Sequence, residues 1–243
     1  QHGRTFFLAT RLLTPQQRPA VHALYGFARR ADDILDDFDA SVSSSERANE
    51  LQRLATRLFN RMTAGATDDG DLSLAAVVDT ARRYDIPWEH CDDFLSSMRM
   101  DLSTTDYPDR AALDRYMYGS AEVIGLQMLP VLGTVCESAE AAPYAAALGK
   151  AFQLTNFLRD VDEDLQRGRI YLPADELAVH QVDREVLNWC HDHHRTDSRV
   201  RRALEEQHAE TRRIYRFAAQ GIALLHPRSR PCISAALTLY SEI

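Results

Sequence analysis

The chain has 243 residues, 45% of them hydrophobic, which is enough to bury a sizeable core in one large domain. Its formal net charge of −8 argues against a nucleic-acid partner, because binding to the phosphate backbone requires a basic excess. With only 10 glycines and 9 prolines, the sequence has little turn material for a many-stranded sheet and favours helices.

Helices are predicted along nearly the whole chain. The first begins at Thr14-Pro15, an N-cap followed by proline, and runs to about residue 37 with apolar residues every three or four positions. Ser43 and Glu46 form a capping box for the second, which should end near residue 63. Further helices are expected at about 72–84, 88–101, 110–134, 138–166, 183–194 and 197–225, and from about residue 229 onward. The expected fold class is all-α, with residues 1–243 in a single domain built as a bundle of about nine or ten helices.

The cysteines and the hydrophobicity pattern bear on where the protein works. The four cysteines lie far apart without a CxxC pair, so we expect reduced thiols in the cytoplasm rather than a disulfide framework. No signal peptide is visible, and no apolar run reaches the roughly 18 residues that span a bilayer. Peripheral contact with a membrane surface stays compatible with the sequence. The chain lacks an initial Met and stops within a helical pattern, which leaves open whether its ends are complete.

A first acidic cluster ends the first predicted helix. Tyr25, Arg29, Asp32 and Asp36 stand at i, i+4, i+7 and i+11, so they form one stripe beside the apolar face. Taken alone, this cluster also fits a solvated acidic end of a surface helix.

A second cluster repeats the pattern in the helix predicted at 138–166. Gln153, Asn156, Asp160 and Asp164 again share one stripe, with Arg159 beside it. Facing carboxylates raise each other's pKa unless cations lie between them, and oxygen ligands without His or Cys favour Mg²⁺ or Mn²⁺. Mg²⁺ is commonly held by one or two carboxylates together with substrate phosphates, so a diphosphate substrate is predicted. Neither cluster has the loop and glycine of an EF-hand, which makes calcium storage a poor fit.

Three segments then carry a resemblance to a known family. Residues 23–37 (ALYGFARRADDILDD) and 156–173 (NFLRDVDEDLQRGRIYLP) resemble the squalene/phytoene synthases, a family of trans-isoprenyl diphosphate synthases. Residues 116–133 are most similar to the bacterial phytoene synthase branch of that family. The resemblance covers nearly the whole chain, and it implies an isoprenoid-synthase-type helical bundle around a central apolar cavity.

The resemblance also implies roles for individual residues. The implied Mg²⁺ ligands are Asp32, Asp36, Asn156, Asp160 and Asp164. The residues implied to act in catalysis are Asp32, Asp36, Asp160, Asp164, Arg29, Arg159, Tyr25 and Tyr116. The implied substrate contacts are His2, Arg4, Thr5, Phe6, Tyr25, Arg29, Tyr116, Ala121, Gly125, Gln153, Asn156, Arg159, Tyr171 and Tyr240.

Two positions depart from the family pattern. Gly3 stands where many relatives have a serine that touches phosphate. Glu122 stands where many have a small glycine on the helix facing the pocket, so its carboxylate either narrows the pocket or points away from it.

The implied reaction is the head-to-head condensation of two geranylgeranyl diphosphates to phytoene. It passes through a cyclopropyl (prephytoene) diphosphate, releases diphosphate, and uses Mg²⁺ or Mn²⁺ without a reductant. The nearest alternative is a C30 synthase that uses farnesyl diphosphate to make presqualene diphosphate, squalene or dehydrosqualene. A non-catalytic binding or assembly homologue would be expected to have broken aspartate motifs, whereas both are intact. A terpene cyclase shares the metal chemistry, but the RGRIYLP segment at 167–173 argues against it.

Overall fold

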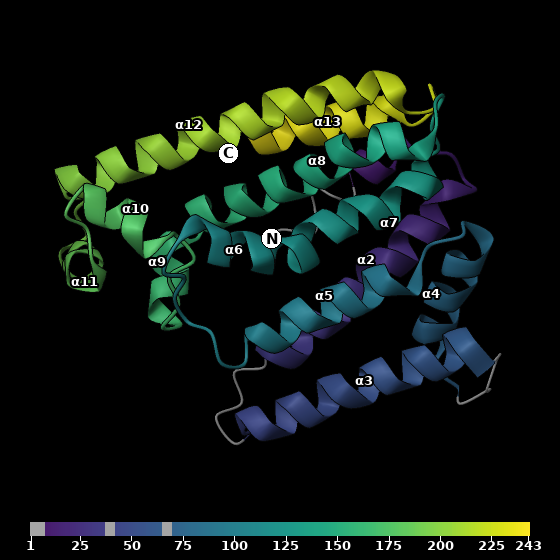
Figure 1. Ribbon diagram of the computed structural model, residues 1–243, viewed down its shortest axis with the longest axis horizontal. Helices are drawn as coiled ribbons and strands as arrows, with labels where there is room; N and C mark the ends of the chain where they lie inside the picture. The colour runs from purple at the N-terminus through teal and green to yellow at the C-terminus, as the bar shows by residue number, and fades with distance from the viewer. Residues whose placement is uncertain (1–7, 37–41, 65–69) are drawn as a thin grey trace.

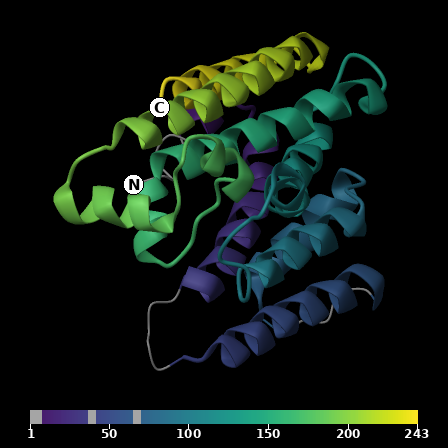
Figure 2. The ribbon, with the colours of Figure 1, turned by 60° about the vertical axis from the view of Figure 1, so that its left-hand side comes forward.

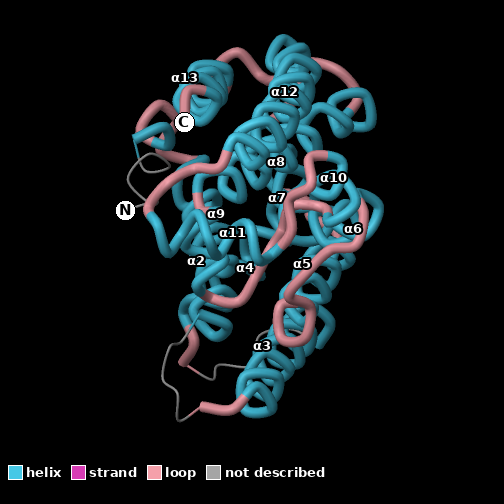
Figure 3. Tube along the Cα trace, turned by 90° about the vertical axis from the view of Figure 1, so that its left-hand side faces the viewer, coloured by secondary structure: helices cyan, strands magenta, loops and turns pink. Residues whose placement is uncertain are grey.

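The computed structural model describes residues 8–36, 42–64 and 70–243, and within these ranges helices and loops make up the chain, without a strand (Figures 1 and 3). The α-helices are α2 (Gln17–Asp36), α3 (Ser44–Ala64), α4 (Leu72–Arg83), α5 (Trp88–Met100), α6 (Arg110–Met117), α7 (Val123–Leu132), α8 (Ser138–Arg159), α9 (Val161–Gln166), α10 (Ala174–Val179), α11 (Arg184–His193), α12 (Ser198–Gln220) and α13 (Arg230–Ser241). A π-helix, η1 (Tyr118–Glu122), joins α6 to α7, and a 3₁₀-helix, η2 (Gly221–Leu224), follows α12. The predicted all-α fold is confirmed.

The helices pack in successive layers, with α8 near the middle. Helix α8 packs against α7 on one side and against α12 and α13 on the other (Figure 1). Figure 2 shows α3 at the opposite end of the molecule from α12 and α13, with α2 and α5 between them. The short helices α9, α10 and α11 gather at the C-terminal end of α8 (Figure 1). Helix α8 therefore separates α7 from α12 and α13 and contacts all three.

Two predicted helices are interrupted in the structure. The helix expected at 110–134 contains the π-helix η1, where Gly119 lies against α5 so closely that an added Cβ would come within 2.3 Å of the Asp93 carbonyl oxygen. The Ser97 hydroxyl donates a hydrogen bond of 2.9 Å to the Tyr116 carbonyl, which satisfies a backbone group at this irregular turn. The helix expected at 138–166 breaks at Asp160, whose φ of −101° and ψ of 13° separate α8 from α9.

The remaining helices agree with the predictions to within a few residues, except that α10 was not predicted. Helix α10 has only six residues and begins directly after Pro173, whose extended backbone marks its start. Six residues are too few for a helical repeat of apolar positions to emerge from the sequence.

Close backbone packing fixes the position of α7 and η1 on α8. A Cβ added at Gly125 would lie 2.1 Å from the carbonyl oxygen of Ala145, and one added at Gly149 would lie 2.3 Å from that of Ala121. Both glycines are therefore required for the helices to approach this closely. The wall between α7 and α8 is built from backbone rather than from movable side chains.

The state of the cysteines and the apolar character of the helices were also predicted from the sequence. Cys91, Cys136, Cys190 and Cys232 are all free thiols, as the sequence predicted. None of the helices within the described ranges combines the length and the apolar character needed to cross a bilayer.

Candidate active site

An apolar cavity of about 340 Å³ runs along α8, enclosed by α2, α7, η2 and α13. Its volume lies in the range of pockets that hold small ligands. Helix α8 contributes one continuous stripe to the wall, because Ala141, Ala145, Leu148, Phe152 and Asn156 recur every three or four residues. The central apolar cavity expected from the sequence is thus present.

Polar side chains line one end of this cavity, which we call the mouth. Tyr25 of α2, Gln153 and Asn156 of α8, and Tyr240 of α13 all contribute to the lining. The Asn156 amide donates a hydrogen bond of 3.5 Å to Gln153 Oε1, and the Tyr240 ring lies 4.5 Å from that of Phe152. Burial raises the pKa of Tyr240, while the positive charge of Arg159 opposes that shift. Four predicted substrate contacts from three helices therefore meet at the mouth.

The second acidic cluster lies where α8 gives way to α9. The Arg159 guanidinium binds the Asp160 carboxylate with two hydrogen bonds of 2.7 and 2.6 Å, and these bonds raise the pKa of Arg159. The Asp164 amide donates to the Asp160 carbonyl at 2.8 Å, so one helical turn still connects the two aspartates. Burial, together with the negative charge of Asp160, raises the pKa of Asp164 to about 7.

The first acidic cluster is described in part. Asp32 is half-buried, whereas Arg29 has 52% of its side chain exposed and binds Asp33 at 2.8 Å. Asp36 ends α2, and its side chain lies outside the described part of the structure. The predicted contacts His2, Arg4, Thr5 and Phe6, and also Gly3, lie outside the described residues.

The donor set suits a hard divalent cation. Among the described residues, no three side chains of His, Cys, Asp or Glu already converge as a complete ion site. The oxygen donors of Asn156, Asp160 and Asp164 follow one another along α8 and α9, and such ligands match Mg²⁺ or Mn²⁺. The raised pKa of Asp164 is the relevant observation, because a nearby cation would stabilise the carboxylate form that burial now disfavours. The residues present therefore fit the metal implied by the sequence.

Tyr116 and Tyr171 lie in a separate aromatic cluster with Tyr107 and Phe157. The rings of Phe157 and Tyr171 stack at 4.1 Å, and Tyr107 lies 5.5 Å from Tyr116. Neither predicted tyrosine lines the cavity, although Tyr171 adjoins Asp164 in a small neighbouring pocket. Burial and the charge of Asp101 raise the pKa of Tyr116 well above its usual value. The aromatic cluster therefore lies next to the second acidic cluster, with Phe157 and Tyr171 beside Asp164.

Asp101 is a residue of this region that the sequence analysis missed. Its carboxylate accepts a hydrogen bond of 2.7 Å from the Tyr116 hydroxyl and one of 3.3 Å from the Tyr171 hydroxyl. The Arg169 guanidinium donates to the Asp101 carbonyl at 3.1 Å. An acidic residue at the C-terminal end of a helix is disfavoured by the helix dipole, and this was the signal available in the sequence.

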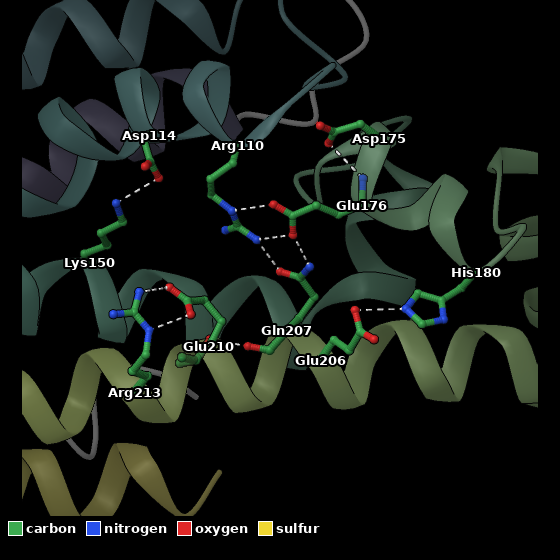
Figure 4. Close-up of polar contacts among 11 residues, drawn as sticks. Arg110, Asp114, Lys150, Asp175, Glu176, His180, Glu206, Gln207, Glu210 and Arg213 are labelled. Atoms are coloured by element: carbon green, nitrogen blue, oxygen red, sulfur yellow. Dashed lines mark hydrogen bonds and ion pairs between the residues drawn. The ribbon is translucent and has the colours of Figure 1, made fainter.

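Gly125 lines the cavity, whereas the neighbouring positions of η1 do not. Ala121 is buried against Gly149 of α8. Glu122 points away from the cavity into a polar groove on the opposite face of α8, 3.6 Å from Lys150 Nζ. Lys150 also binds Asp114 at 2.8 Å (Figure 4), and burial raises the pKa of Glu122. The departure at Glu122 therefore leaves the cavity as wide as a small residue would.

Comparisons with known proteins identify the family of the chain. The family model described as squalene/phytoene synthase matches residues 1–243. A phytoene synthase of Arthrospira platensis is 35% identical, with all of this chain and 79% of the relative covered. A chloroplastic phytoene synthase 3 of Zea mays is 37% identical over all of this chain, which spans 56% of that relative's length.

Solved structures give the same fold. A dehydrosqualene synthase in complex with a ligand superposes with a TM-score of 0.86 at 26% identity, covering 98% of this chain and 79% of the other. The squalene synthase HpnC of Alicyclobacillus acidocaldarius superposes with a TM-score of 0.85 at 22% identity, covering 98% and 85%, and shows the fold alone. On the evidence of the whole-chain family match and these relatives, the chain belongs to the squalene/phytoene synthase family.

Proposed function

We propose that the protein condenses two geranylgeranyl diphosphates head to head into phytoene, through a cyclopropyl (prephytoene) diphosphate, with release of diphosphate. One observation carries the proposal: a long apolar cavity has Tyr25, Gln153, Asn156 and Tyr240 at one end, next to the end of α8 that carries Arg159 and Asp160. Such a site matches a substrate with a diphosphate head and a hydrocarbon tail. Two relatives at 35% and 37% identity that are named phytoene synthases support the choice of product.

Two arginines near the mouth residues, Arg159 and Arg29, would bind the diphosphate. Arg159 presents a planar guanidinium that now holds Asp160 and can hold phosphate oxygens in the same fork geometry. Arg29, exposed and bound to Asp33, would add a second guanidinium once it turns toward the substrate. Charge-assisted bonds to the leaving group favour ionisation of the allylic carbon–oxygen bond.

The cavity walls would protect the cations that follow. Aliphatic side chains exclude the water that would otherwise quench a carbocation as an alcohol. The rings of Tyr25, Phe152 and Tyr240 lie at the mouth, where their faces can stabilise positive charge near the reacting carbons. The double bond of the second substrate attacks the allylic cation there, and loss of a proton closes the cyclopropane ring.

Asp32, Asp36, Asn156, Asp160 and Asp164 would hold Mg²⁺ or Mn²⁺. A bound divalent cation would supply charge neutralisation for the diphosphate leaving group. The residues themselves would serve to keep the two acidic clusters facing one substrate head, with Asp160 and Asp164 on successive turns.

A C30 product is the second candidate, because the structural match to a dehydrosqualene synthase is close, with a TM-score of 0.86. The two candidates use the same chemistry and differ by one isoprene unit in each substrate. Squalene formation would also need a reductant, which phytoene formation does not.

The proposal is tested by incubating the protein with Mg²⁺ and either geranylgeranyl or farnesyl diphosphate, without reductant, and identifying the lipid products by mass spectrometry. A C40 hydrocarbon from geranylgeranyl diphosphate is expected. A product formed only from farnesyl diphosphate would replace phytoene synthesis with the C30 candidate. The absence of coupled product from both substrates would favour a non-catalytic homologue.

A further inference from the structure

The cavity has a closed end opposite the mouth, and its geometry bears on substrate length. The closed end is lined by Leu13, Leu132, Ala141, Leu225 and Cys232. Ala141 is buried, as are the four larger side chains around it. Ala141 and Cys232 are the small members of this group, so they leave the space into which a hydrocarbon chain can reach.

Helix α8 provides a scale for the depth of the cavity. Gln153 lines the mouth, and Ala145 and Ala141, which also line the cavity, precede it by eight and twelve residues along α8. At 1.5 Å per residue, Ala145 lies about 12 Å and Ala141 about 18 Å from Gln153 along the helix axis.

These depths match successive lengths of an isoprenoid chain. A fully extended peptide spans about 3.3–3.6 Å for three backbone bonds, so an isoprene unit, with four chain bonds, spans about 4.5 Å. Three units then reach about 14 Å, close to the level of Ala145, and four reach about 18 Å, the level of Ala141. On this scale, only a fourth unit would reach the level of Ala141.

A set of partly buried hydrogen bonds lies at this end of the molecule, next to the cavity-lining residue Leu132. The Gln17 amide donates to the carbonyls of Val131 and Leu132 at 3.0 and 3.2 Å, and to Ser229 Oγ at 2.8 Å. The Ser229 hydroxyl, 0% exposed, donates in turn to the Leu132 carbonyl at 2.6 Å. We call this set the polar clasp; it joins the N-terminus of α2, the C-terminus of α7 and the start of α13.

The polar clasp makes the closed end a firm limit. A chain that reached past Leu132 would separate the buried Ser229 hydroxyl from its acceptor, and an unpaired buried polar group is costly. The backbone next to Leu132 is held further by an isolated β-bridge between Thr134 and Leu225. The floor is therefore fixed by backbone and hydrogen bonds, while the room above it depends on side-chain size.

We propose that Ala141 is a specificity-determining residue whose methyl side chain leaves room at the closed end for the fourth isoprene unit. The site then prefers a C20 over a C15 diphosphate because only the longer chain fills the space between Ala141 and the polar clasp. This inference rests on the proposed function and names the residue that sets its substrate length.

The test compares the intact wild-type chain with Ala141→Leu in mixtures of geranylgeranyl and farnesyl diphosphate. Leucine should block the fourth unit and lower the C40-to-C30 product ratio roughly tenfold or more, the order expected for misfit of a few carbons in an apolar pocket. Turnover of farnesyl diphosphate alone should persist, which also reports a folded enzyme. An unchanged product ratio in Ala141→Leu would overturn the inference.

Controls separate this outcome from loss of folding and from failure of the proposed function. Ala147→Leu adds the same side chain to the opposite face of α8, in the polar groove, and should leave the ratio unchanged. Should Ala141→Leu fail to fold, Ala141→Val must lower the ratio in the same direction or the inference fails. If the wild type couples neither substrate, the proposed function is lost, while binding of geranylgeranyl and farnesyl thiodiphosphate still measures the effect of Ala141.

Discussion

The two faces of α8 use charge in opposite ways. On the groove face, bases and acids pair with one another: Lys150 with Asp114 and Glu122, and Arg213 with Glu210 (Figure 4). At the C-terminal end of α8, next to the mouth, burial and the negative charge of Asp160 raise the pKa of Asp164 even though Arg159 binds Asp160. Charges balanced within the fold stabilise it, whereas carboxylates that repel each other indicate a site that takes a cation or works with one. The contrast predicts different results from mutation on the two faces.

The largest effect is expected from Asp160→Ala. Loss of this carboxylate removes a predicted metal ligand and the partner of Arg159, so kcat should fall by roughly 10³-fold or more at saturating Mg²⁺. Circular dichroism should show an unchanged helix content. The matched control is Asp162→Ala, an exposed neighbour that binds His191 rather than facing the mouth. Activity of Asp160→Ala within a few-fold of wild type would contradict the metal assignment.

A pH effect on stability is expected from Asp164, in the small pocket next to the cavity. The pKa of Asp164 is about 7 in the fold and near 3.8 when unfolded, so the native state holds the proton more tightly. The stability contributed by the protonated form is therefore present at low pH and lost as the pH rises toward and through about 7.

Because Asp164 is partly exposed, the loss should be no more than about 1–2 kcal/mol. Urea denaturation of metal-free protein between about pH 5 and pH 8 would measure it. Asp164→Asn, which carries no titrating group, should flatten this part of the profile. A wild-type profile that rises with pH over the same interval would contradict the assignment.

On the groove face, Lys150→Met should affect stability rather than catalysis. Without the ammonium, Glu122 and Asp114 lose a shared partner and repel each other, so the free energy of unfolding should fall by about 1–2 kcal/mol. kcat should stay within about twofold of wild type, because the groove is separated from the cavity by α8. Glu122→Gln in the Lys150→Met background should recover part of the stability. A large loss of kcat without loss of stability would contradict the assignment of the groove face to stability alone.

Much of the fold was readable because its signals are local. The capping pair Ser43 and Glu46 is present, with the Glu46 carboxylate accepting from the Ser43 amide at 2.8 Å, and α3 begins at residue 44. The stripe that includes Gln153 and Asn156 also follows from helical spacing alone, and these side chains do meet at the mouth.

What the sequence did not reveal depends on contacts between distant segments. Asp101 meets Tyr116 and Tyr171 only after three separate segments have packed, and the polar clasp joins Gln17 to Ser229 across most of the chain. The π-helix was not predicted, because one extra residue in a single turn changes the spacing of apolar residues very little over eight or ten positions.

The π-helix also sets the rotational phase of α7. An α-helix turns about 100° per residue, so a wide turn of i→i+5 bonds shifts all later side chains around the axis relative to an uninterrupted helix. That shift is what lets Gly125 face the Ala145 carbonyl at a distance no side chain could tolerate. Removal of one residue from η1 would eliminate the wide turn and leave Gly125 at that carbonyl, whereas a regular α-helix of unchanged length would bring Ile124 or Leu126 there. The position of Gly125 in the cavity wall thus depends on a wide turn that lies outside the cavity lining.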